Sequence, residues 1–259
     1  MKHKISLVLG SGGARGLAHI GVIKWLTAKG YEIDEIVGCS IGSLVGAAFA
    51  EGRINELSHW MSNLTKREVF RLMDFTDPRF GILKGERVFH TLQDVFEDMA
   101  IEDLKIKYTA VATDLVEGKE VIFREGSIYA AIRASIAIPA VFRGVEQKGR
   151  FLVDGGVLNP IPINYVQETN TITVVVNLDG APNGDNETHY AKLNALGILQ
   201  ESYIAMRRRL SNMSLALYKP DYVVDVPHNM AGIWDFDRAS ELIESGYELA
   251  EKQLVSLLA

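Results

Sequence analysis

The sequence has a single cysteine, Cys39, among its 259 residues, so no disulfide bond can form within the chain. It has no apolar run of about 18 residues, the length that marks a membrane-spanning helix. The apolar stretch at its start is short and leads directly into glycines, which is typical of a first strand and not of a signal peptide. We therefore expect a cytoplasmic protein, and we expect any contact with the inner face of the membrane to be peripheral.

Long runs of positive charge and metal-binding motifs are also missing. The net charge is −6 and the only basic cluster is Arg207-Arg208-Arg209, so nucleic acid is not expected as a partner. The sequence contains no H-E-x-x-H segment and no group of Cys and His with the spacing of metal ligands. We therefore expect neither a metal nor another cofactor.

The chain does have an apolar content of 47% without repeats or linkers, which predicts one packed α/β domain over residues 1–259. Its opening residues predict a strand at 5–9, a helix at 17–29, a strand at 33–37 and a helix at 41–50. This βαβα order implies a parallel sheet with right-handed crossovers.

The second strand and the second helix meet at Gly38-Cys39-Ser40-Ile41-Gly42, which fits the G-x-S-x-G nucleophile elbow. Such an elbow holds its serine at the strained apex of a tight turn, and the flanking glycines prevent collisions with neighbouring backbone. The helix N-terminus adds partial positive charge near the serine oxygen. The alternative is a glycine-rich turn with a solvated serine, but the strand before it and the helix after it favour a nucleophilic Ser40.

The glycine loop at residues 10–16, GSGGARG, allows several interpretations. A dinucleotide site requires a third glycine where Arg15 stands, and a P-loop requires lysine after its last glycine, where this chain has leucine. A loop of the short-chain dehydrogenases would require a Y-x-x-x-K pair, which the chain lacks. An oxyanion hole made by the backbone N–H groups of Gly12, Gly13 and Ala14 needs no residue that is missing, and a nucleophilic serine requires one.

A serine also needs a base within hydrogen-bond reach. Two histidines, His189 and His228, follow a plausible acid in the order Ser–Asp–His, although neither lies in a motif. Asp154 ends a predicted strand, and the two glycines after it let another segment come close. A buried carboxylate there could act as the base, yet an Asp-Gly turn that only caps the strand fits the spacing equally well.

Three stretches taken together, GSGGARG, GCSIG and DGG, resemble the marks of patatin-like phospholipases, in the same order and setting. Segments such as GILKGERVF, AIRASIAIPAVF and DGGVLNPIPI are similar to those of the small bacterial members, which are related to the catalytic domain of neuropathy target esterase. The resemblance covers nearly the whole chain. It implies a three-layer α/β/α fold, a modified α/β-hydrolase with a mostly parallel central sheet.

The resemblance also implies the chemistry, which is cleavage of lipid carboxylic esters, typically of phospholipids or lysophospholipids, through an acyl-enzyme and without a metal. Ser40 would be the nucleophile and Asp154 the general base of a catalytic dyad. The residues of the oxyanion loop would be Gly12, Gly13, Ala14 and Arg15. The motif glycines are Gly10, Gly16, Gly38, Gly42, Gly155 and Gly156. Ser11 departs from the family, whose loop often has glycine there, but serine still permits a tight turn.

Three questions stay open at this point. The first alternative to the dyad is a Ser–Asp–His esterase that uses His228 or His189. The second is a regulatory protein of low turnover on the same fold, which the presence of both Ser40 and Asp154 argues against. The apolar residues within 60–83 are typical of plain core, and alternatively they line an acyl-chain channel or touch a membrane surface.

Two helices are expected within about 191–217, and one over 84–99.

Overall fold

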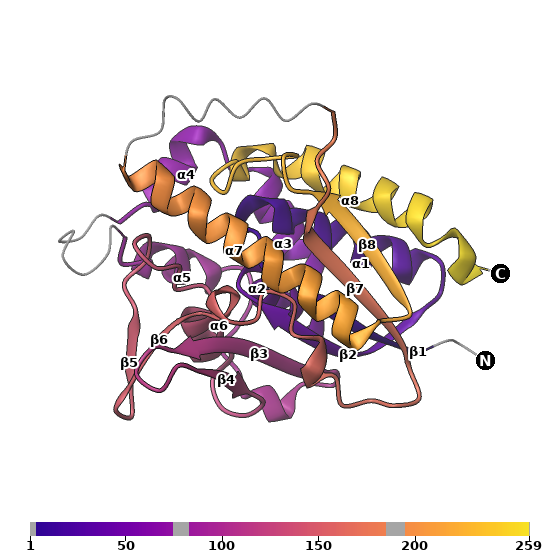
Figure 1. Cartoon of the computed structure of the whole chain (residues 1–259), viewed down its shortest axis with the longest axis horizontal. Coiled ribbons are helices and arrows are strands. Elements are labelled where there is room, and N and C mark those ends of the chain that lie inside the picture. The colour runs from indigo at the N-terminus through magenta and orange to yellow at the C-terminus, as the bar shows by residue number, and fades with distance from the viewer. Residues whose placement is uncertain (1–3, 75–82, 185–194, 259) are drawn as a thin grey trace.

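The computed structural model describes residues 4–74, 83–184 and 195–258. Within them eight strands form one sheet in the order β5-β6-β3-β2-β1-β7-β8, with β4 paired to β3 (Figure 1). The strands are β1 (Lys4–Leu9), β2 (Glu32–Cys39), β3 (Lys107–Asp114), β4 (Lys119–Phe123), β5 (Val145–Gln147), β6 (Arg150–Asp154), β7 (Ile172–Gly180) and β8 (Tyr222–Pro227). Strands β3, β2, β1, β7 and β8 are parallel, whereas β4, β5 and β6 pair antiparallel. The sheet is therefore mostly parallel, as the sequence predicts.

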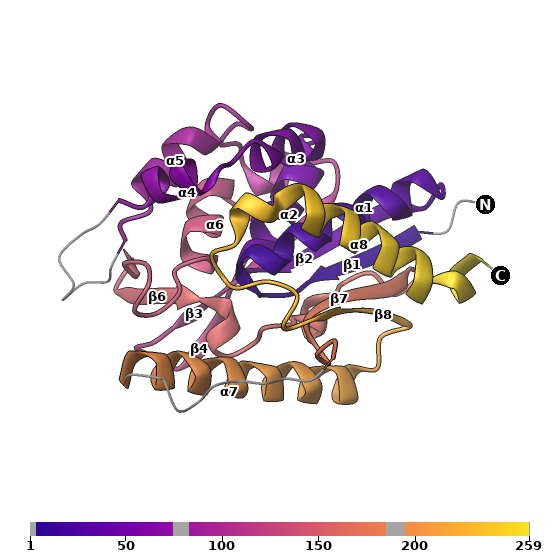
Figure 2. The same ribbon diagram turned by 90° about the horizontal axis from the view of Figure 1, so that it is seen from above.

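Helices cover both faces of the sheet, which confirms the predicted three-layer α/β/α architecture (Figure 2). The long helix α7 lies along one face, and α1, α2 and α8 lie on the other, with α3 beyond them. The helices are α1 (Ala18–Ala28), α2 (Ile41–Ala50), α3 (Ile54–Ser62), α4 (Lys66–Leu72), α5 (Glu86–Leu92), α6 (Ile128–Ser135), α7 (Ala195–Tyr218) and α8 (Ala239–Gln253).

Strand β1 shows why the sheet is buried on both faces. Ile5, Leu7 and Leu9 belong to the large core that includes α1, α2 and α8, whereas Val8 packs with Val37 in a separate cluster. Because successive side chains point to opposite faces, a strand covered on both sides needs apolar residues nearly throughout. This requirement explains the continuous apolar run with which the chain opens.

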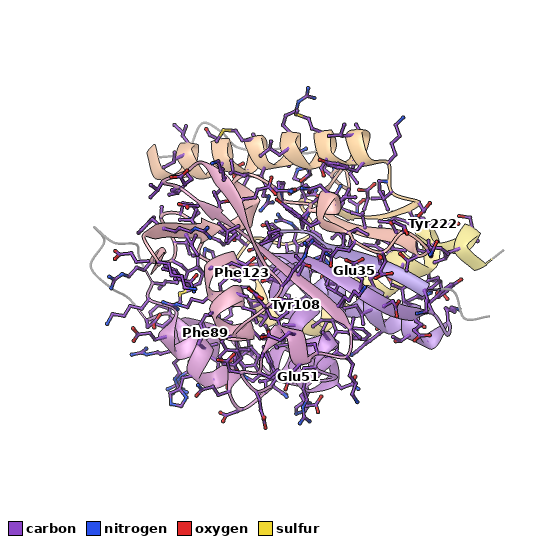
Figure 3. The ribbon with its side chains drawn as sticks, turned by 90° about the horizontal axis from the view of Figure 1, so that it is seen from below. Glu35, Glu51, Phe89, Tyr108, Phe123 and Tyr222 are labelled. Atoms are coloured by element: carbon purple, nitrogen blue, oxygen red, sulfur yellow. The ribbon has the colours of Figure 1, made fainter. Side chains whose placement is uncertain are left out.

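The helix predicted over 84–99 is shorter in the structure, where α5 ends at Leu92. The residues that follow make bonds elsewhere. The Glu97 N–H donates to the carboxylate of Glu51 at the end of α2 (3.0 Å; Figure 3 labels Glu51), and Asp98 accepts a backbone N–H from the first turn of α6 (3.1 Å). These contacts with other elements end the helix, although its apolar spacing continues.

The prediction of two helices within 191–217 is wrong for the described part of that range. One continuous helix, α7, runs from Ala195 to Tyr218. Between Ile198 and Tyr218 the sequence has neither glycine nor proline to interrupt it. On the face of the sheet opposite α2, this helix and residues 161–166 pack over Val8, Val37 and Val175.

Candidate active site

Ser40 lies between the end of β2 and the start of α2, and its side chain is only 3% exposed. Its φ of 56° and ψ of −126° fall in a backbone region that residues other than glycine rarely adopt, and the strain costs about 1–3 kcal/mol of conformational free energy. Three donors hold this conformation. The Ser40 N–H donates to Ser135 Oγ (2.8 Å), and the N–H and Oγ of Ser43 donate to the Ser40 carbonyl (2.8 and 2.6 Å). Tyr108 of β3 supports the same turn by donating to the Ser43 carbonyl (2.8 Å; Figure 3).

The glycines on either side of Ser40 are required by close backbone contacts. A Cβ on Gly38 would lie 2.5 Å from the Gly42 carbonyl oxygen, and a Cβ on Gly42 would lie 2.1 Å from the carbonyl oxygen of Leu9. Helix α2 therefore approaches both β2 and β1 more closely than any side chain would allow. The local G-x-S-x-G pattern corresponds to a real elbow in the structure.

Asp154 ends β6, and its carboxylate reaches the elbow. Ser40 Oγ donates to Asp154 Oδ2 at 2.5 Å, and the Gly156 N–H donates to Oδ1 at 2.7 Å. Burial raises the pKa of Asp154 to about 6, although the hydrogen bonds from Ser40 and Gly156 oppose the rise. A Cβ on Gly155 would lie 2.3 Å from the Val111 carbonyl, so the two glycines let the chain turn tightly beside β3. The carboxylate and the hydroxyl are thus placed for direct proton transfer.

The glycine loop lies next to Ser40, and its donors are used unequally. The Ser11 N–H donates to the Pro160 carbonyl (2.9 Å) and the Ala14 N–H to the Ile233 carbonyl (3.1 Å). Within the described residues, the N–H groups of Gly12 and Gly13 have no acceptor. Gly13 has a φ of 60°, and a Cβ there would lie 2.9 Å from the Ile233 carbonyl oxygen. Two adjacent N–H groups therefore remain for a ligand.

The Arg15 side chain is buried and holds the loop to its surroundings. Its guanidinium donates to the carbonyls of Leu178 (3.2 Å) and Ala231 (3.0 Å), and lies 4.0 Å from Asp179. Burial lowers the pKa of Arg15 to about 10. Gly16 completes the loop, since a Cβ there would lie 2.2 Å from Ile41, the first residue of α2. Gly10 begins it, and its N–H donates to the Val176 carbonyl of β7 (3.2 Å).

Two of the histidines, His228 and His19, have a hydrogen bond to a backbone carbonyl. His228 Nδ1 is 2.9 Å from the Gly180 carbonyl at the end of β7. His189 lies outside the described residues. His19 is fully buried beneath the glycine loop, where desolvation lowers its pKa to about 4, and its Nε2 donates to the Gly10 carbonyl (2.9 Å). His19 is therefore a neutral group that fixes the loop.

Sequence reasoning missed Ser135, Ser43 and His19, which orient the elbow and the loop. Ser135 belongs to AIRASIAIPAVF, a segment that the resemblance singles out without a chemical reason. Its Oγ accepts from the Ser40 N–H and donates to the Val111 carbonyl (2.6 Å), so it connects the elbow to β3. No local pattern predicts such a contact, because α6 and β2 are far apart in the sequence.

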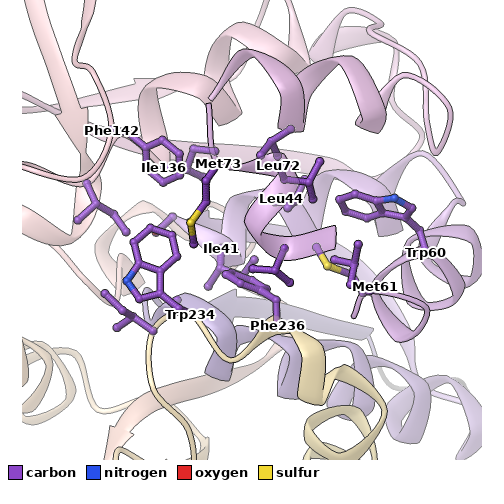
Figure 4. A pocket seen from close by; sticks show the side chains of 17 residues that line it. Ile41, Leu44, Trp60, Met61, Leu72, Met73, Ile136, Phe142, Trp234 and Phe236 are labelled. Carbon is purple, nitrogen blue, oxygen red and sulfur yellow. The ribbon is translucent and has the colours of Figure 1, made fainter. Parts of the chain in front are cut away.

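An apolar cavity opens at Ser40 on the side of the sheet that carries α2 (Figure 4). Among the described residues, none that lines it carries a charge. Labelled side chains in Figure 4 come from α2, α3, α4 and two loops, and include Leu44, Trp60, Leu72, Phe142 and Trp234. The apolar residues of 60–74 therefore line a cavity next to the serine. We call this the Ser40 cavity.

Neither a metal site nor a membrane span is found in the described part of the chain. Its residues include no group of three or more His, Cys, Asp or Glu placed to hold a metal ion. In the same ranges, no helix has both the length and the apolar character needed to cross a bilayer.

Comparison with known proteins adds three findings. A family model described as patatin-like phospholipase matches residues 7–166, more than half of the chain. An NTE family protein of Mycobacterium tuberculosis, itself called uncharacterized, is 48% identical over 182 residues, which cover 70% of this chain and 51% of that protein. Patatin-like phospholipase domain-containing protein 6 of Mus musculus is 33% identical over 178 residues, covering 66% of this chain and 13% of that protein.

The chain thus spans about half the length of the mycobacterial relatives that it matches. Among solved structures, the crystal structure of VipD from Legionella pneumophila is similar, with a TM-score of 0.54. The likeness covers 99% of this chain and 67% of that one at 12% sequence identity, so it concerns the fold alone.

Proposed function

The chain belongs to the patatin-like phospholipase family, and from this premise we propose that it hydrolyses lipid carboxylic esters through an acyl-enzyme on Ser40, with Asp154 as the general base. The 2.5 Å hydrogen bond between Ser40 Oγ and the buried Asp154 carboxylate is the observation that carries the proposal. The proposal treats residues 1–259 as a single patatin-like domain. It also places the protein in the cytoplasm, in peripheral contact with the inner face of the membrane.

In the proposed mechanism, Ser40 Oγ attacks the ester carbonyl carbon while its proton passes to Asp154. The tetrahedral intermediate then breaks its bond to the alcohol oxygen, which takes the proton back from Asp154. Water repeats the cycle on the acyl-enzyme: it gives a proton to Asp154, attacks the acyl carbon, and releases the acid as Ser40 recovers the proton. The mechanism requires no metal or other cofactor.

The glycine loop is the proposed oxyanion hole. Of the expected residues Gly12, Gly13, Ala14 and Arg15, the first two have N–H groups without acceptors in the described residues. We propose that these two N–H groups donate hydrogen bonds to the oxyanion of the tetrahedral intermediate. Ala14 and Arg15 then act by holding the loop, Ala14 through Ile233 and Arg15 through its buried guanidinium.

The acyl chain is proposed to lie in the Ser40 cavity. That cavity begins at the nucleophile and has an uncharged, apolar lining in the described residues, as a hydrocarbon chain requires. This supports a lipid ester as the substrate class.

Fluorophosphonate labelling together with ester hydrolysis tests the proposal. Ser40→Ala should lose labelling and at least about a hundredfold in kcat/KM, which is roughly 3 kcal/mol of transition-state stabilisation. Ser62→Ala, at an exposed position on α3, is the control and should behave as wild type. Wild-type protein that is neither labelled nor active would instead favour the regulatory alternative.

Histidine variants separate the dyad from the triad. Asp154→Asn should abolish turnover and slow labelling, whereas His228→Ala and His189→Ala should each cost less than about tenfold. A nearly inactive His228→Ala beside an active Asp154→Asn would establish the triad instead.

A further inference from the structure

A second apolar cavity adjoins the glycine loop, and the proposed function does not use it. Ser11 and Gly13 line it from the loop, and residues 138–141 line it from the segment after α6. Helix α7 contributes Tyr203 and Ile204, among others. We call this the α7 cavity.

The two cavities share one wall. Gly13, Ile138 and Ile233 line both of them. The Ser40 cavity extends among α2, α3 and α4, and the α7 cavity lies against α7, the helix on the other face of the sheet (Figure 2). A molecule bound at the shared wall could therefore extend in both directions.

Asp154 is connected to the lining of the α7 cavity through Gly156 and Ser11. Its Oδ1 accepts the Gly156 N–H (2.7 Å), and Gly156 packs so closely against Ser11 that a Cβ there would lie 2.8 Å from Ser11 Oγ. Ser11 in turn lines the α7 cavity. The charge of Asp154 also contributes to raising the pKa of Tyr203, a second residue of that lining.

This connection bears on the direction in which the alcohol leaves. The proton that Asp154 accepts from Ser40 must be returned to the alcohol oxygen as the carbon–oxygen bond breaks. The alcohol oxygen must therefore face Asp154, and the α7 cavity, lined by Ser11, offers an apolar space for the rest of the alcohol.

We propose that the α7 cavity binds the hydrocarbon part of the leaving alcohol, while the Ser40 cavity binds the acyl chain. This assignment rests on the proposed function of Ser40 and Asp154. It predicts a preference for esters whose alcohol part also carries an apolar chain.

The lining of the α7 cavity favours a hydrocarbon chain over a phosphate group as its occupant. Arg207 is the cation in the lining, and its guanidinium is engaged by Asp179 through two hydrogen bonds (2.5 and 3.2 Å). Because its charge is neutralised within the protein, it offers little to a phosphate group. The remaining helix and loop residues of the lining are mainly aliphatic.

Two isomeric esters, butyl octanoate and octyl butyrate, test the assignment. They have the same composition, but butyl octanoate has a long acyl chain and octyl butyrate has a long alcohol chain. Val69 and Ile204 are both half-buried, β-branched helix residues, and each lines only one of the two cavities. Val69→Trp should lower kcat/KM for butyl octanoate at least about tenfold and leave octyl butyrate within about threefold. Ile204→Trp should do the reverse. Ala205→Trp, at the adjacent exposed position of α7, should change neither.

Each variant should still cleave one of the two esters, and that remaining activity shows that the variant is folded. If Ile204→Trp does not fold, Leu199→Trp at the 61%-exposed rim of the same cavity replaces it. For Ile204→Trp, an equal loss on both esters, no loss on octyl butyrate, or a greater loss on butyl octanoate would each overturn the assignment. Ser40→Ala is tested in parallel: if it still cleaves both esters, the proposed function fails, whatever the cavity variants show.

Discussion

In the proposed dyad, Asp154 performs alone the task that a histidine and a carboxylate share in a triad. A carboxylate at its ordinary pKa of 3.8 would be a weak base, and burial at the end of β6 raises that pKa to about 6. The group is therefore still ionised at neutral pH but binds a proton more readily. Its environment, rather than an additional residue, supplies the basicity.

The pH dependence of activity follows from this shift. Below about pH 6 Asp154 is protonated and cannot accept the Ser40 proton, so kcat/KM should fall about tenfold for each further pH unit. The measurement is kcat/KM for a short-chain ester across about pH 5 to 8. A flat profile in that range would contradict Asp154 as the base.

The same shift means that the ionised carboxylate of Asp154 destabilises the folded state. Its carboxyl is protonated in both folded and unfolded states well below pH 3.8, and the cost develops as pH rises to about 6. The difference of roughly two units corresponds to about 3 kcal/mol. Asp154→Asn, which keeps the shape, should therefore unfold at a higher urea concentration than wild type at pH 8 and lose that advantage at acidic pH.

Urea midpoints at about pH 4 and pH 8 measure this effect. Asp103→Asn, at an exposed position, is the control for loss of a carboxylate. Equal midpoints for Asp154→Asn and wild type at pH 8 would show that the buried charge carries no penalty.

At the residue scale, the sequence predicts the positions that lie in short motifs. Ser40 and Asp154 are each marked by adjacent glycines, and the structure brings their side chains into contact. Ser135 could not be predicted, because its role depends on α6 meeting β2 across a long stretch of chain. The pairing of Asp154 with Ser40 required the family resemblance, since spacing alone allowed a plain Asp-Gly turn.

At the scale of elements, the elbow depends on the distance between α2 and β1. Gly42→Ala would place a methyl group 2.1 Å from the Leu9 carbonyl oxygen, so the helix would have to move away from the strand. We expect a loss of more than about 3 kcal/mol in the free energy of unfolding, and loss of fluorophosphonate labelling in any protein that folds. Chemical denaturation measures the first and gel fluorescence the second.

Gly52→Ala is the matched control. Gly52 also lies near α2, with a φ of +86°, and a Cβ added there would have nothing within 4 Å. Its substitution should cost only about 1 kcal/mol of backbone strain and leave labelling unchanged. Similar effects of the two substitutions would show that the elbow does not depend on close approach.

The elements β1, α1, β2 and α2 follow from local patterns, because their apolar runs and the glycines next to them indicate the same boundaries. The three-residue strand β5 and the early end of α5 do not follow, because partners on other elements determine them. No local pattern marks the continuity of α7, and the prediction of two helices there is wrong for that reason. Element ends are thus the part of the fold that the sequence predicts least well.

At the scale of the whole molecule, the βαβα order at the start of the chain predicted a parallel sheet, and the family resemblance predicted the three-layer fold. The distribution of helices between the layers was not predicted, and in the structure the long helix α7 lies along one face while α1, α2 and α8 lie on the other (Figure 2). The cavities are a further property of the assembled molecule. Their walls combine residues from both ends and the middle of the chain.

Catalysis without a metal is a prediction for the whole molecule. The proposed nucleophile, base and oxyanion donors are side chains and N–H groups of the chain itself, and the described residues include no cluster of metal ligands. Incubation with EDTA should therefore leave kcat/KM unchanged. A loss that a divalent ion restores would contradict the metal-free mechanism.

The shared wall of Gly13, Ile138 and Ile233 has a stereochemical consequence. A chain site on either side of this wall, together with donors at the carbonyl oxygen, would fix an ester at three points. With these points fixed, the two remaining substituents of the glycerol stereocentre, the hydrogen and the free CH2OH arm, exchange places between the enantiomers. The two enantiomers of a diacylglycerol, identical in solubility and chain length, would then meet a handed site that accepts one of them more readily than the other.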